Sequence, residues 1–343
     1  MGVPLVLPPA ITHGPVARAE ALYQGRRAPA ARWRRWLSRA LSLLGLALAG
    51  ILFGAEFAGS LLQRDAGTVG AALGFAPEAL MLFTLALHFG LMARTLSRSA
   101  HSITREQHGR TWDMLVLTGQ DARQIVLGKW WATVRGLAAD YLVLGALRAA
   151  VIVWMAGSAG RAMLVMYAGV YAAPYANPLT LPETWLPSPA LYLLAGTLVI
   201  GLTLANLGLT AACGLLASSG GRSSSLALAL AAATRTGLLL GAALLVLLPY
   251  GAARLTFLLF DLNLTWLDDI VPRLTATLVD NGVTLGAELA AYRFFDIPDN
   301  TLLIAATGLI TLAVYGLFTW ALLARAERRA VRQMALPPRR PAR

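Results

Sequence analysis

Five ionisable side chains lie inside long apolar segments of the sequence, where a charge is costly and marks a functional site by default. They are Glu56, His88, Asp140, Arg148 and Arg235. They could line a polar path for a transported substrate, or they could pair between helices and extend to the membrane surface. Asp140 and Arg235 lie within ~15 Å of one end of their segments and can reach that end or each other. Arg148 and Glu56 lie deeper, where they could line a polar path or pair with each other across the third and first spans.

The sequence carries none of the signatures that we would expect of a hydrolytic or metal-dependent enzyme. There is no HExxH pair and no GxSxG elbow, and of four histidines only His101 and His108 are close, among arginines that disfavour a metal. Gly128-Lys129 has the end of a Walker A motif, but tryptophan follows it and Arg123 stands where the first glycine is required. We therefore expect no catalytic residue, cofactor or metal site in this chain.

The composition indicates an integral membrane protein. The 343 residues are 57% hydrophobic and 13% charged, whereas soluble domains average about a quarter charged. Lysine and arginine number 29 against 17 acids. In a membrane protein such an excess sets topology and contacts anionic lipid, so we expect no nucleic acid as a partner. The single cysteine, Cys213, excludes an intramolecular disulfide, and we expect it to be buried.

The apolar segments predict an all-α fold with six transmembrane helices. The spans cover approximately residues 40–62, 77–96, 136–155, 191–217, 226–249 and 301–323. The first is too long for the core of a signal peptide, so we expect it to be retained. Small residues recur at three- and four-residue spacing in the fourth span, which favours close helix packing: Gly201, Ala205, Gly208 and Ala212.

Arginine content alternates between the connecting segments and predicts their sides of the membrane. Segments 15–39, 94–135, Arg222 and 325–343 are basic, whereas 64–76, 157–189 and 250–300 are poor in arginine or acidic. The positive-inside rule then places both termini in the cytosol of a multi-pass protein of the cell inner or plasma membrane.

This topology divides the chain into three parts. We predict a cytosolic amphipathic segment at 1–39, the six-span domain at 40–324 and a basic cytosolic tail at 325–343. Within the six-span domain, 157–189 is expected as an interfacial loop on the outer side. Residues 250–300 are expected as an outer loop that carries short helices between the last two spans.

The polar stretch 97–132 between the second and third spans has the layout of a helical hairpin. Gly109 interrupts its first helix, and Asp121 begins a capping box for a second helix that places Ile125 and Lys129 on one face. An apolar tip with charged flanks is typical of a hairpin that docks on another protein. The alternative is a solvated loop with two helices resting at the membrane surface.

This stretch resembles the cytosolic loop of type-2 ATP-binding-cassette (ABC) exporter permeases. The likeness rests on ITREQHGRTWDMLVLT at 103–118 and RQIVLGK at 123–129. The six spans, the basic amphipathic start and the long loop before the last span also resemble that family. The resemblance implies that the stretch contacts a separate nucleotide-binding subunit, which binds ATP and magnesium. It also implies that two permease subunits pair around a central path.

The family pattern assigns ATPase-coupling roles to a defined set of residues. The set is Glu106, Gly109, Thr111, Asp113, Leu117, Arg123, Ile125, Gly128 and Lys129. Two positions depart from the pattern: Gly119 stands where proline is common, and Gln124 stands where glutamate is common. We expect a more flexible turn and one charge fewer toward the partner.

Two other functions fit a six-span membrane protein. A proton-driven secondary carrier could use Glu56, His88 or Asp140 as a relay, although no internal repeat of the kind common in carriers is visible. A membrane scaffold without transport activity would tolerate replacement of all the intramembrane charges. The substrate of an ABC exporter or of a proton-driven carrier does not follow from the sequence.

Overall fold

The computed structural model describes residues 9–12, 14–26, 32–62, 76–109, 120–171, 189–220, 223–260, 271, 274–278 and 300–335. The regular elements in these ranges are α-helices: α1 (Pro9–Thr12), α2 (Pro15–Arg26), α3 (Arg32–Leu62), α5 (Ala76–Ala100), α6 (Ser102–His108), α8 (Ala122–Tyr171), α9 (Pro189–Ser218), α10 (Ser224–Phe260) and α13 (Asn300–Ala335). In this part of the chain six helices, α3, α5, α8, α9, α10 and α13, are long and apolar enough to cross a membrane. The predicted all-α fold with six candidate spans is therefore confirmed.

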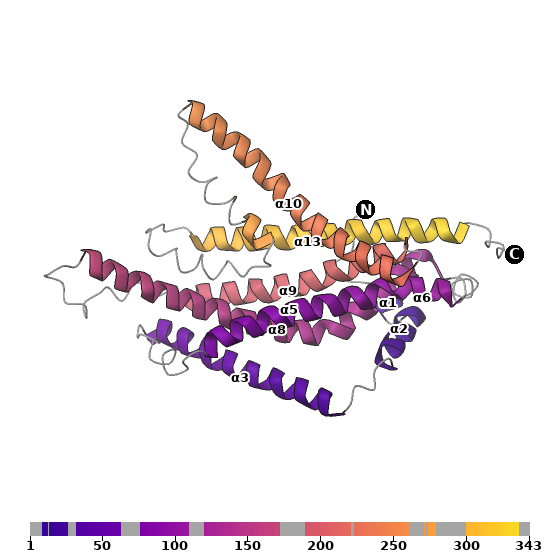
Figure 1. Cartoon of the computed structure of the whole chain (residues 1–343), viewed down its shortest axis with the longest axis horizontal. Helices are drawn as coiled ribbons and strands as arrows, with labels where there is room; N and C mark the ends of the chain where they lie inside the picture. Colours follow the sequence, from indigo (N-terminus) through magenta and orange to yellow (C-terminus); the bar gives the residue numbers. More distant parts are fainter. Residues whose placement is uncertain are drawn as a thin grey trace.

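The centre of the bundle is α9, which packs against α5, α8, α10 and α13. Figure 1 shows α9 between α13 and α5, with α3 at one edge and the far end of α10 leaving the bundle. Residues around its whole circumference are buried, including Leu202, Leu209 and Cys213 at 0% exposure. These side chains are covered by other helices and not by lipid, so α9 forms the core of the bundle.

Small residues let the neighbouring helices approach α9 closely. Within the predicted stripe, Gly208 lies against Trp130 of α8, whose indole N–H donates to the Gly208 carbonyl at 3.0 Å. Gly201 faces Leu312 of α13. The tightest approach is outside the stripe, at Gly214, where a Cβ would overlap the Ser99 side chain of α5. The small residues therefore serve three different neighbours rather than one helix partner.

Helix α8 is one continuous helix of 50 residues, which corrects two expectations. Residues 122–135, expected as the second arm of a hairpin, continue directly into the third span. Residues 157–171, expected as an interfacial loop, extend the same helix. The first proline after Ala122 is Pro174, so nothing removes a backbone hydrogen-bond donor over this length. The glycines within it cost only about 1 kcal/mol each.

The expected outer loop at 250–300 is also shorter than predicted. Residues 251–260 continue α10 past Pro249 instead of forming a separate short helix. Val271 and residues 274–278 are helical, and the carbonyl of Leu278 accepts a hydrogen bond of 2.8 Å from the Tyr315 hydroxyl of α13. The rest of that segment lies outside the described residues.

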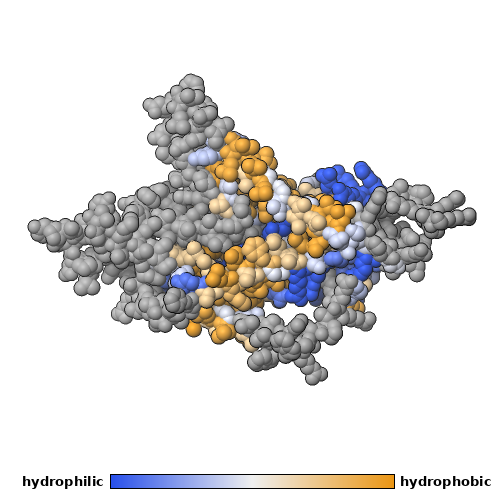
Figure 2. Space-filling view, viewed as in Figure 1, coloured by the Kyte–Doolittle hydropathy of each residue, from blue (hydrophilic) through white to orange (hydrophobic). Residues whose placement is uncertain are grey.

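Polar residues gather at one end of the bundle. Figure 2 shows hydrophobic residues over the middle of the described helices and mostly hydrophilic ones toward the end where α2 and α6 lie in Figure 1. Helices α1, α2 and α6 and the beginning of α8 all lie at this end, called the α6 end below. Exposed leucines on α10, such as Leu245 and Leu248 at 75% and 67% exposure, fit a helix that faces lipid.

Replacing Gly214 by alanine should destabilise the protein, because the new Cβ overlaps Ser99 and stands 3.0 Å from the backbone nitrogen of Ala100. Overpacking of this kind costs about 1–3 kcal/mol. The matched control is Gly237→Ala in α10, where nothing lies within 4 Å. Thermal unfolding in detergent should show a lower melting temperature for Gly214→Ala alone, and equal melting temperatures for the two variants would contradict the packing described.

Candidate functional site

The short helix α6 is held at its beginning by the end of α9. The Ser218 hydroxyl accepts hydrogen bonds from the backbone N–H groups of Ile103 and Thr104 at 2.9 and 3.0 Å. The Thr104 hydroxyl donates back to the Ser218 carbonyl at 3.2 Å. An N-cap is normally supplied by the residue before the helix, but here it comes from a helix 115 residues away in sequence. The orientation of α6 is therefore fixed to the core helix of the bundle.

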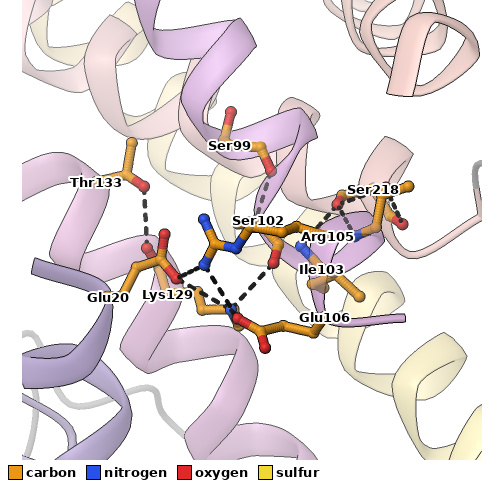
Figure 3. Close-up of polar contacts among 10 residues, drawn as sticks. Glu20, Ser99, Ser102, Ile103, Arg105, Glu106, Lys129, Thr133 and Ser218 are labelled. Atoms are coloured by element: carbon orange, nitrogen blue, oxygen red, sulfur yellow. Dashed lines mark hydrogen bonds and ion pairs between the residues drawn. The ribbon is translucent and has the colours of Figure 1, made fainter. Parts of the chain in front are cut away.

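The last turn of α6 is held by a buried ion-pair network (Figure 3). The Lys129 ammonium of α8 donates to Oε2 of Glu20 at 3.1 Å, to Oε1 of Glu106 at 3.2 Å and to the Ser102 carbonyl at 3.1 Å. The Arg105 guanidinium donates to the same two carboxylate oxygens, at 2.9 and 3.0 Å. Below, Glu20, Arg105, Glu106 and Lys129 are called the tetrad.

The tetrad joins three helices and balances its own charge. Glu20 belongs to α2, Arg105 and Glu106 belong to α6, and Lys129 belongs to α8. Two cations face two carboxylates, and all three ammonium protons of Lys129 have an acceptor. The Lys129 and Glu20 side chains are only 2% and 3% exposed. Buried charges persist only when they are paired and hydrogen-bonded in this way.

Packing around the tetrad keeps α2 in place. A Cβ at Gly128 would stand 3.3 Å from the Val16 side chain, so α2 crosses α8 where α8 has no side chain. The Arg105 guanidinium also lies 3.5 Å from the ring centroid of Tyr23 in α2, a cation–π contact. Sequence reasoning missed Glu20, although it is the only acid among the first 39 residues and Lys129 is the only lysine of the chain.

The structure divides the predicted coupling residues into three groups. Gly109 and Arg123 are exposed at the α6 end, and the Glu106 side chain keeps 17% of its surface exposed. Ile125, Gly128 and Lys129 are buried against α2 and α6 and cannot meet a partner directly in this conformation. Thr111, Asp113 and Leu117 lie outside the described residues. The coupling roles stay predictions, and for the buried residues the role would be to position α6.

The predicted intramembrane residues occur in separate places. Asp140 pairs with Arg94 of α5 at 2.8 Å, with both side chains about half exposed, and does not pair with Arg235. The carboxylate of Glu56 packs against α8 where Gly157 leaves room for it. Arg148 is 4% exposed, and its pairing with Glu56 stays a prediction.

Arg235 of α10 reaches into the core of the bundle and is 8% exposed. Its guanidinium donates to the Asn206 side-chain carbonyl at 2.8 Å and to the Thr210 hydroxyl at 3.0 Å, both on α9. Arg148 and Arg235 both lie near enough to His88 for their charges to act on its imidazole. Within the described ranges, His88 Nδ1 and Asn206 Nδ2 are buried without a hydrogen-bond partner. This cluster is the best candidate for a polar path through the bundle.

Replacing Lys129 by methionine should strongly destabilise the protein, because Glu20 and Glu106 would then face each other with Arg105 alone. Removing one partner of a buried pair costs about 3–5 kcal/mol. The matched control is Arg94→Gln, which breaks the half-exposed pair with Asp140 and should cost at most about 1 kcal/mol. Thermal unfolding in detergent measures both, and a Lys129→Met variant no less stable than Arg94→Gln would show that the tetrad contributes little.

Comparison with known proteins identifies no relative of this chain. No protein-family model matches the chain, and no curated protein matches it. The site is therefore described by its own residues: a multi-span helical bundle with a short helix fixed to its core at the α6 end and a basic polar cluster between α5, α8, α9 and α10.

Proposed function

We propose that this chain is the membrane subunit of an ABC exporter and works with a separate nucleotide-binding subunit. The observation that carries the proposal is the fixing of α6 by Ser218 and the tetrad. A force applied to a helix held in this way passes to α2, α8 and α9 together. Such attachment suits an element on which a motor subunit pushes, and the sequence around it has the pattern of an exporter coupling loop.

In this proposal the exposed residues of the α6 end meet the partner, and the buried ones transmit its movement. Gly109 and Arg123 are accessible, and Thr111, Asp113 and Leu117 complete the predicted contact. The partner binds ATP and magnesium, and the binding energy of ATP shifts the balance between inward-open and outward-open states. A second permease subunit, identical or different, completes the path.

The intramembrane charges fit this function better than a proton relay. A relay needs carboxylate or imidazole groups that gain and lose a proton within the membrane. Of the three predicted relay residues, Glu56 lies apart from the others, against α8, and His88 lies beside the basic cluster. Asp140 instead pairs with Arg94 at a half-exposed position, and the buried cluster around Arg235 is basic. The alternatives of a proton-driven carrier and of a scaffold are kept as outcomes of the test below.

The proposal predicts that an ATPase co-purifies with the tagged full-length chain from its native membranes. Arg123→Glu should lower that recovery by at least about tenfold, because a like charge placed at an interface costs more than the ~1.4 kcal/mol that a tenfold loss requires. The matched control is Arg332→Glu, an exposed charge reversal on α13 that should leave recovery unchanged. Recovery is measured by quantitative mass spectrometry of the purified complex.

Two results would contradict the exporter assignment. The first is the absence of any ATPase from the purified material, together with transport that ignores ATP depletion and stops with an uncoupler, which identifies a proton-driven carrier. The second is an unchanged phenotype after replacing His88, Arg148 and Arg235 by leucine, which identifies a scaffold.

A further inference from the structure

A cavity of about 790 Å³ lies between α2 and the neighbouring parts of α5 and α8. It is separate from the tetrad and from the cluster around Arg235. Its lining includes Arg18 and Leu22 of α2, Arg98 of α5, and Trp131 and Arg135 of α8. Cavities of this size bind small molecules in other proteins.

Three guanidinium groups from three helices line this cavity, and their charge is not neutralised locally. Within the described part of the chain, Arg18, Arg98 and Arg135 form no ion pair with a carboxylate. Asp140 lies near enough to Arg98 to act on it, but its carboxylate is engaged by Arg94 at 2.8 Å. Among the described residues, the cavity therefore gathers three guanidinium groups that no carboxylate pairs with directly.

The remaining walls of the cavity are mostly apolar. Leu22 is 64% exposed on the cavity side of an amphipathic helix, and Ala17 beside it is buried. The site thus combines cationic groups with a mostly apolar surface.

The position of the cavity along the helices matches the headgroup level of a bilayer. Arg98 lies in the last turn of α5, after that helix's apolar stretch. Arg135 lies five residues before Asp140 of α8, whose carboxylate pairs with Arg94 of α5. Arg98 and Arg135 therefore both lie on the α6 side of this half-exposed pair. The ends of spanning segments are where lipid phosphates and basic side chains meet.

We propose that this cavity binds one anionic phospholipid. Its phosphate group contacts Arg18, Arg98 and Arg135, and an acyl chain lies along Leu22 and the apolar walls. Arginine suits this role because its planar fork of N–H groups matches two phosphate oxygens. A soluble phosphate ester shares the headgroup chemistry, but the apolar walls and the level in the membrane favour a lipid.

The bound lipid fastens α2 to α5 and α8 from the side opposite to Glu20. The helix that carries one member of the tetrad is then held by the protein on one side and by the membrane on the other. This inference goes beyond the proposed exporter function and does not depend on any partner subunit, since the isolated chain in detergent suffices to test it.

The test is a thermal-shift titration of the detergent-purified full-length chain with phosphatidylglycerol, with phosphatidylcholine of the same acyl chains, and with glycerol 3-phosphate. Phosphatidylglycerol should stabilise the protein at lower concentrations than the other two. Each arginine near an anionic lipid contributes roughly a fivefold gain in affinity. The triple variant Arg18→Gln, Arg98→Gln, Arg135→Gln should therefore bind on the order of 100-fold more weakly.

The matched control removes three exposed arginines from α13, namely Arg325→Gln, Arg328→Gln and Arg332→Gln, and should keep the preference. If the triple cavity variant does not fold, the single variant Arg135→Gln, at an exposed position, should weaken binding about fivefold. An unchanged preference in the cavity variants, or an equal loss in the α13 control, would overturn the site. A shift with glycerol 3-phosphate equal to that with phosphatidylglycerol would overturn the assignment to lipid.

Discussion

The buried contact between Lys129 and Glu20 is the interaction on which the α6 end depends. Without it, α2 would be held to the bundle by Arg105, which contacts Glu20 and Tyr23, and by the packing of Val16 against α8. With it, α2, α6 and α8 share two carboxylates and two cations, of which Glu20 and Lys129 are almost fully buried. Separating any one of these side chains would leave a buried charge without its partner. The three helices are therefore expected to move together.

The second constraint is the position of α9, whose end connects the core to the surface. Ser218 caps α6, and the Leu216 carbonyl accepts a hydrogen bond of 3.3 Å from Arg329 of α13. The last turn of a helix leaves carbonyl groups without hydrogen-bond donors. A basic side chain there donates to these carbonyls and interacts favourably with the negative end of the helix dipole. The end of α9 thus links α6 to α13, and Arg235 ties α10 to α9 deeper in the bundle. These contacts connect α6, through α9, to the helices around the polar cluster, so a movement of α6 is expected to displace them.

The fold was predictable where composition and periodicity decide it, and the site was not. Apolar length identified six spans, since backbone groups in lipid must be satisfied within a helix. The boundaries of α8 and α10 were missed because residues 157–171 contain no proline to end α8, and Pro249 does not end α10. Lys129 was singled out from a loop pattern, but its partner Glu20 lies 109 residues away, and such pairing follows only from the folded arrangement. The same holds for Ser218 as the cap of α6.

Hydrogen–deuterium exchange of the purified chain tests most directly whether the tetrad unites the α6 end. The comparison is between the unaltered protein and the Glu20→Gln variant, which keeps the shape of the side chain and removes its charge. The account predicts faster exchange in both α2 and α6, and unchanged exchange in the core of α9, because local opening follows the loss of a shared contact. Faster exchange confined to α2, with α6 unchanged, would contradict the claim that the two helices are held as one unit.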